Sequence, residues 1–105
     1  MDERKLNKEQ LNAKLNTWAG TKGIDYTDPE FGIAHCFKRL VPKLQQLNQP
    51  YGYTIQVEFP SGSDVCWASI VDYKELPEKV YSANNKQPAL ALCLATEKLI
   101  DEEGK

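Results

Sequence analysis

Hydrophobic residues recur at helical spacing near the start of the chain. Within residues 7–19 they lie at positions i, i+4 and i+7: Leu11, Leu15 and Trp18. Positions with this spacing share one face of a helix. Asn7 followed by Gln10 has the form of a capping box, and Gly20 is a residue type that commonly follows a helix end. The pattern predicts a short amphipathic helix over residues 7–19.

A second helix is predicted from Asp28 onwards. Asp28 is a good N-cap, and Pro29 suits the first helical position because its φ is already helical. The apolar residues then follow at alternating spacings of four and three: Ile33, Phe37, Leu40, Leu44 and Leu47. Pro42 removes one backbone donor within this run, but the apolar phase continues beyond it. We therefore expect a kink at Pro42 and no helix end there.

Residues 51–59 alternate between apolar and polar side chains, as is typical of a strand. Turn-forming residues follow at 60–64, and residues 65–71 are again β-branched and aromatic. The two runs predict an antiparallel hairpin. A third, short edge strand is predicted at residues 79–83.

The second strand of the hairpin carries apolar residues on both faces. Cys66, Ala68 and Ile70 share one face, and Val65, Trp67 and Val71 share the other. We therefore expect both faces of this strand to be covered. Four aromatic residues of the hairpin are expected in the core: Tyr51, Tyr53, Phe59 and Trp67. A base-stacking surface is disfavoured because no Lys or Arg is interleaved with them.

The last predicted helix is the most apolar. Pro88 stands at a first helical position, and residues 89–103 place one set of side chains on a common face: Leu92, Cys93, Thr96, Leu99 and Ile100. Leu90, Leu94 and several alanines widen this apolar surface. We expect a central helix that packs on more than one side.

Together these elements predict an α+β fold with three helices. The predicted architecture is an α-β-α sandwich around an antiparallel hairpin sheet of two to three strands. The helix at residues 7–19 is expected to cover the remaining apolar edge or the other face of the sheet. The 105 residues are the size of a single domain, residues 1–105, with its core over about residues 7–103.

Composition and charge narrow the class of protein. The 41% hydrophobic and 27% charged residues are ordinary for a globular domain, so disordered and coiled-coil classes are disfavoured. The net charge of -2 disfavours a nucleic-acid partner. No apolar run is long enough to cross a bilayer, and the N-terminal residues contain no hydrophobic signal core. We therefore expect a cytoplasmic protein without a membrane partner.

No specific catalytic, metal or cofactor motif is found in the sequence. Its three cysteines, Cys36, Cys66 and Cys93, form no CxxC pair, and we expect them to be buried thiols. His35 is the single histidine, which excludes a metal cluster built on histidines. His35 and Cys36 would point about 100 degrees apart on a helix, so a catalytic dyad is not expected.

Three segments resemble the small ABA-sandwich family of phages and prophages: DPEFGIAHCFKRLVPKL, DVCWASIV and QPALALCLATEKLI. The matching features are Asp28, Trp67 and residues 88–95, and the likeness spans about residues 11–100. The chain departs from the family at Trp18, which follows a threonine where the family usually has glycine, and in the charged residues 72–79. The resemblance implies a phage or prophage accessory protein in the cytoplasm of a bacterial host, from a family known for its fold and without an established activity.

Two groups of residues are candidates for an interaction surface. On the predicted second helix, His35, Lys38, Arg39 and Lys43 lie away from the apolar stripe and form a basic ridge. This ridge is either a solvated helix face or a contact surface for an acidic or phosphate-bearing partner. Tyr26, Tyr73 and Tyr81 lie on or beside the predicted loops, where they are either anchors for a partner or ordinary, partly exposed side chains.

Three functions remain open. A non-enzymatic accessory protein that binds a host or phage protein needs only a stable scaffold and surface residues. A small-ligand or nucleotide binder needs a pocket with convergent polar groups, and a hydrolase needs a catalytic set that the sequence does not display. The first is therefore the predicted function. A homodimer is also predicted, because the sheet has an edge strand and C2 dimers are the commonest closed assembly.

Overall fold

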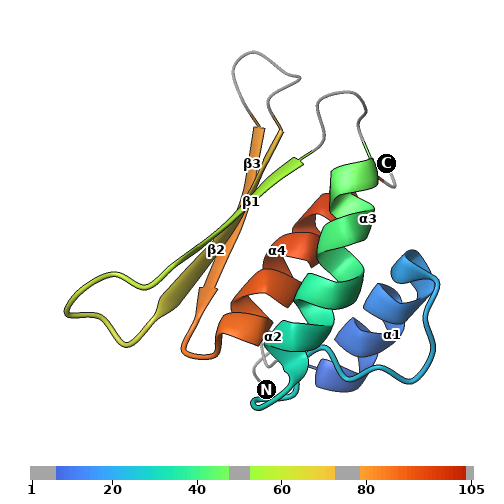
Figure 1. Cartoon of the computed structure of the whole chain (residues 1–105), viewed down its shortest axis with the longest axis horizontal. Coiled ribbons are helices and arrows are strands. Elements are labelled where there is room, and N and C mark those ends of the chain that lie inside the picture. The colour runs from blue at the N-terminus through green and yellow to red at the C-terminus, as the bar shows by residue number, and fades with distance from the viewer. Residues whose placement is uncertain (1–6, 48–52, 73–78, 104–105) are drawn as a thin grey trace.

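The computed structural model describes residues 7–47, 53–72 and 79–103, as helices packed on one antiparallel sheet (Figure 1). The elements along the chain are α1 (Lys8–Ala19), α2 (Gly32–His35), the π-helix η1 (Cys36–Leu40), α3 (Val41–Gln46), β1 (Tyr53–Glu58), β2 (Cys66–Asp72), β3 (Lys79–Asn85) and α4 (Pro88–Glu103). The segments α2, η1 and α3 follow one another without a break, so they form one irregular helix.

The sheet has the strand order β1-β2-β3, with each neighbouring pair antiparallel. Ile70 at the centre of β2 lies opposite Ile55 of β1 and Tyr81 of β3. The predicted α+β class, with an antiparallel sheet and three helical regions, is confirmed. The third strand extends beyond the predicted residues 79–83 and ends at Asn85.

The two long helices begin and end where their local signals place them. The side chain of Asn7 accepts a hydrogen bond from the backbone N–H of Gln10 at 3.0 Å, and Gly20 closes α1 with φ 74°. Pro88 is the first residue of α4, as predicted. Caps formed within a few residues thus define both helices.

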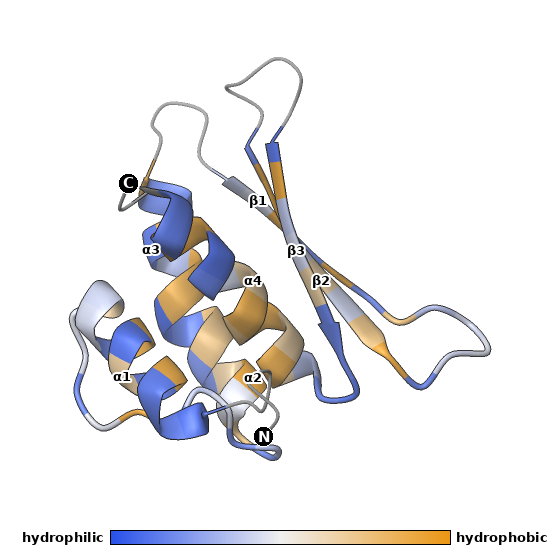
Figure 2. Ribbon diagram, turned by 180° about the vertical axis from the view of Figure 1, so that it is seen from behind, coloured by the Kyte–Doolittle hydropathy of each residue, from blue (hydrophilic) through white to orange (hydrophobic). Residues whose placement is uncertain are grey.

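Three layers are present, and the sheet is the outer one. Helix α4 packs against β2 and β3, α3 lies beside β1, and α1 packs against α4 on the side away from the sheet (Figure 1). The helix at residues 7–19 was expected on the edge or the second face of the sheet, and it takes neither place. The reason lies in α4, whose wide apolar surface is buried on two sides: residues 89–93, 95, 96 and 99 are all buried. Figure 2 shows α4 as the most apolar of the helices and α1 as largely hydrophilic.

The second face of the sheet is largely exposed among the described residues. Trp67 on this face is 42% exposed and Val80 is 52% exposed, although Val71 is buried. The expected two-sided burial of β2 therefore holds at Val71 and fails at Trp67. Of the four aromatic residues expected in the core, Tyr53 is buried, Phe59 is 70% exposed, and Tyr51 lies outside the described residues.

The second helix begins later than predicted. The carboxylate of Asp28 accepts hydrogen bonds from the backbone N–H groups of Glu30 and Phe31, at 2.7 and 3.1 Å. Asp28 therefore caps a turn over residues 29–31, and regular helix begins only at Gly32.

The π-helix η1 changes which side chains of the second helix are buried. The backbone N–H of Val41 donates to the carbonyl of Cys36, five residues earlier, so the chain is wider here than an α-helix. This widening directly precedes Pro42, which has no N–H and whose ring crowds the preceding turn. Cys36 therefore takes the core position that regular spacing assigned to Phe37, and Phe37 is 50% exposed. Beyond Pro42 the helix continues through α3, as expected.

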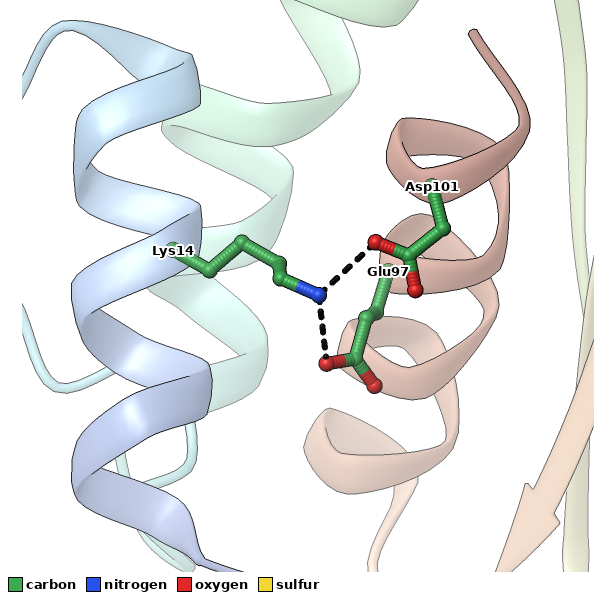
Figure 3. A network of polar contacts seen from close by, with 3 residues as sticks. All are labelled: Lys14, Glu97 and Asp101. Carbon is green, nitrogen blue, oxygen red and sulfur yellow. Dashed lines mark hydrogen bonds and ion pairs between the residues drawn. The ribbon is translucent and has the colours of Figure 1, made fainter. Parts of the chain in front are cut away.

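An ion-pair network joins α1 to α4 (Figure 3). Lys14 of α1 donates to Glu97 at 3.1 Å and to Asp101 at 2.8 Å. The hydrogen bond to Asp101 is the largest influence on the pKa of Lys14 and, with the contribution of Glu97, holds this pKa above its usual value although burial opposes the shift. The network links α1 to the side of α4 that faces away from the sheet.

We expect Lys14→Met to lower the free energy of unfolding by less than about 1 kcal/mol at pH 7, because the pair is partly exposed. The folded-state pKa of Lys14 is raised, so its contribution is fully present below the usual value of 10.5 and disappears as pH rises through the folded pKa. Urea unfolding from pH 8 to pH 11 measures this difference, and the variant of the exposed Lys22, Lys22→Met, is the control. A difference that grows with pH would contradict the assignment.

Candidate functional site

The predicted basic ridge is divided into two parts. The ammonium group of Lys43 lies 5.2 Å from the centre of the Trp18 ring, so this side chain packs against α1. Lys38 and Arg39 on η1 are exposed, and His35 is half-buried. Of the four ridge residues, Lys38 and Arg39 are therefore the two whose charged groups are exposed for an ion pair with a partner.

The two predicted tyrosine anchors that the structure describes, Tyr26 and Tyr81, are buried. Tyr26 is fully buried, with its hydroxyl 2.7 Å from the hydroxyl of Thr21, and Tyr81 is 7% exposed. Tyr73 lies outside the described residues. Tyr26 and Tyr81 are structural residues in this fold, since a partner cannot reach their rings.

A groove of about 360 Å³ lies between the irregular helix and the edge of the sheet. Its lining residues are Phe37, Val41 and Gln45 from η1 and α3, and Tyr53, Thr54, Ile55 and Val57 from β1. Phe37 and Val41 are one turn apart on the helix, and Ile55 and Val57 are half-buried on the strand face that points to the helices. The groove thus has apolar walls on both sides.

The groove reaches the outer edge of β1. Strand β1 is an edge strand of the sheet. In the part of the chain that the structure describes, its outer edge pairs with no other strand. Thr54 lines the groove although its side chain belongs to the opposite face of the sheet from Tyr53 and Ile55. The main chain of β1 is therefore part of the groove wall, beside the apolar side chains.

Sequence reasoning did not identify this groove because it placed Phe37 in the core. The sequence pattern assigned Phe37 to the buried stripe, whereas in the structure Cys36 takes that position and Phe37, on η1, is exposed. Pro42 was the one available signal, since it indicated a local distortion of the helix. The direction in which that distortion rotates the preceding residues depends on packing against α4, which the sequence pattern does not specify.

The three thiols are buried, as predicted. The Sγ atoms of Cys36 and Cys93 lie 3.7 Å apart, and both thiols contact the carbonyl oxygen of Tyr26, at 3.7 and 3.3 Å. The hydrogen bond with Cys36 and burial raise the pKa of Cys93 far above its usual value, and burial raises the pKa of Cys66. The thiolate is the nucleophilic form of cysteine, so the raised pKa values disfavour Cys66 and Cys93 as nucleophiles in the folded protein.

We expect the folded protein to react with the thiol reagent DTNB at least about a hundredfold more slowly than the urea-unfolded chain, because reaction requires an exposed thiolate. Absorbance at the same reagent concentration measures both rates, and the unfolded chain should release one equivalent for each of its three cysteines. A rapid full equivalent from the folded protein would contradict the buried placement.

Within the described ranges, no group of three or more His, Cys, Asp or Glu side chains is placed to hold a metal ion. None of the described helices combines the length and the apolar character that crossing a bilayer requires. Comparisons of the chain with protein-family models, with curated proteins and with solved structures find no match. The resemblance to the phage family therefore stays a prediction.

Proposed function

We propose that the protein is non-enzymatic and acts by binding another protein, as an accessory protein of phage or prophage origin in the bacterial cytoplasm. The observation that carries this proposal is the half-exposed ring of Phe37 in a groove beside β1, which is an edge strand of the sheet that the structure describes. Aromatic side chains in such positions are typical anchors of protein interfaces.

The chemistry of the described residues agrees better with binding than with catalysis. Burial removes Cys36 and Cys93 as nucleophiles, and His35 stands beside one of these thiols without a hydrogen bond to it among those that the structure describes. None of the residues that line the groove is charged, whereas a nucleotide site needs charged or polar groups that converge on the phosphates.

Affinity capture from a bacterial host lysate tests this proposal. The immobilised wild-type chain is compared with Phe37→Ser and with Phe31→Ser, whose ring is 59% exposed and does not line the groove. We expect a specific protein whose recovery falls at least about tenfold with Phe37→Ser and is unchanged with Phe31→Ser, since truncating an anchor commonly costs more than 1 kcal/mol. Thermal melting checks that both variants fold.

The alternatives give different results in the same series. A protein captured equally by all three chains would place the interface elsewhere, on the exposed face with Trp67 or on the loops. If no specific protein is captured and nucleotides or small metabolites raise the melting temperature, the protein is a small-ligand binder. Turnover of a hydrolase substrate would refute the non-enzymatic assignment.

A further inference from the structure

We infer that the groove binds an extended peptide segment of the partner, which adds to the outer edge of β1 as a fourth strand. This inference rests on the proposed protein-binding function and specifies how the partner binds. The peptide would place apolar side chains at alternate positions against Phe37 and Val41, with an acidic residue near Lys38.

The two edge strands of the sheet, β1 and β3, differ in how far they are blocked from pairing with a further strand. At the β3 edge, the ammonium group of Lys98 donates to the carbonyl of Ser82, so a side chain of α4 occupies part of that edge. Strand β1 spans six residues and contains no Lys or Pro, the two residue types that commonly block edge pairing. Among the described residues, the part of the β1 edge from Thr54 to Glu58 is therefore the better placed of the two edges to accept a further strand.

The groove is placed so that a strand added to β1 would also contact the helix. A strand added to β1 would continue the sheet about 5 Å outward, into the groove that Phe37 and Val41 line. Side chains alternate between the two faces of a strand, so every second side chain of the peptide would point toward these two residues. Main-chain hydrogen bonds then supply affinity, and the apolar wall selects the side chains.

Charge specifies the peptide further. Lys38 is exposed and follows Phe37 in the chain; it does not line the groove itself, but its long side chain starts one residue from the groove wall. Its ammonium group would attract a carboxylate on a peptide that lies beside Phe37. Val41 and Ile55 favour aliphatic residues in the same peptide. The expected ligand is thus an extended segment with alternating aliphatic residues and at least one Asp or Glu.

Selection from a displayed library of random peptides tests the inference, with the full chain as bait and Phe37→Ser as the counter-selected decoy. We expect enriched peptides with alternating aliphatic residues and an acidic residue. An enriched peptide is then synthesised with a fluorescent label and with N-methyl groups at single positions. Every second N-methyl group should weaken binding at least about tenfold, because only alternate N–H groups of a strand point to the edge it joins.

One further protein variant and hydrogen exchange complete the test. Lys38→Glu leaves the core untouched, and we expect it to weaken an acidic peptide about threefold and to reduce the salt dependence of binding. Amides of β1 should exchange more slowly when the peptide is bound, and those of β3 should not change.

Each remaining outcome would overturn the inference. Peptides that need Phe37 but tolerate N-methylation at every position would exclude strand addition and leave the proposed protein binding in place. A selection without enrichment over the decoy would exclude peptide recognition by this groove. A dimer in light scattering that Phe37→Ser converts to monomer would show that a second copy of the chain occupies the groove.

Discussion

Replacing Gly32 with alanine is expected to lower the free energy of unfolding by about 2 kcal/mol. A Cβ atom at this position would lie 2.5 Å from the carbonyl oxygen of Tyr26 and 3.0 Å from the Cβ of Ala89. Such distances force the backbone to move, and overpacking of this kind typically costs 1 to 3 kcal/mol or more. The better helix propensity of alanine offsets at most about 1 kcal/mol. Urea unfolding of the variant measures the net loss.

The atom closest to an added Cβ at Gly32 is the main-chain oxygen of Tyr26. A second substitution, at Ala89, tests whether this oxygen or the Ala89 side chain is the obstacle. A rotation of the Tyr26 carbonyl group would break the contacts that the thiols of Cys36 and Cys93 make with its oxygen. Removing the Ala89 methyl group should therefore fail to rescue Gly32→Ala, with a coupling free energy below about 1 kcal/mol in a double-mutant cycle. A full rescue would show that α4 is the obstacle and that Tyr26 is not.

Gly32 also links stability to the candidate site. It lies at the start of α2, and the same continuous helix carries Phe37 into the groove. A backbone shift at Gly32 would move η1 relative to the edge of β1.

Elements with local signals were the ones that the sequence predicted well. The cap of Asn7 and the position of Pro88 depend on neighbours within a few residues, so α1 and α4 begin where expected. The alternation at Ile55 and Val57 likewise identifies β1 without knowledge of its partner strand.

The features that were not predicted depend on residues far apart in the chain. The outward turn of Phe37 follows from a π-helix beside Pro42 and from the burial of Cys36 against Cys93. Trp67 is exposed because α1 packs against α4 and does not cover the second face of the sheet, and no pattern within one helix decides between these two places. The groove combines both effects, because it needs Phe37 turned outward and an edge strand beside it. The sequence therefore predicted the helix and the strand that line the groove, but it did not predict that they form a groove together.

A second large effect is expected at Asn16, whose amide holds the loop after α1. The side-chain N–H₂ of Asn16 donates to the carbonyls of Asn12 and Ile24, at 2.8 and 2.9 Å. The amide oxygen accepts from the backbone N–H of Ile24 at 3.2 Å and from the hydroxyl of Thr21 at 2.7 Å. Since Thr21 in turn contacts the buried hydroxyl of Tyr26, one side chain ties the loop to the core.

We expect Asn16→Ala to lower the free energy of unfolding by about 2 kcal/mol, because four hydrogen bonds worth about 1 kcal/mol each are lost and water replaces part of them. Asn16→Asp keeps the acceptors and loses the donors, so it should be at least as unstable, with a carboxylate facing two carbonyl groups. The exposed neighbour variant Thr17→Ala is the control and should change stability by less than about 0.5 kcal/mol. Urea unfolding gives the free energies, and faster amide exchange at Ile24 identifies the loop as the part released. Equal stability of Asn16→Ala and the wild type would mean that burial of the Tyr26 ring alone holds this loop in place.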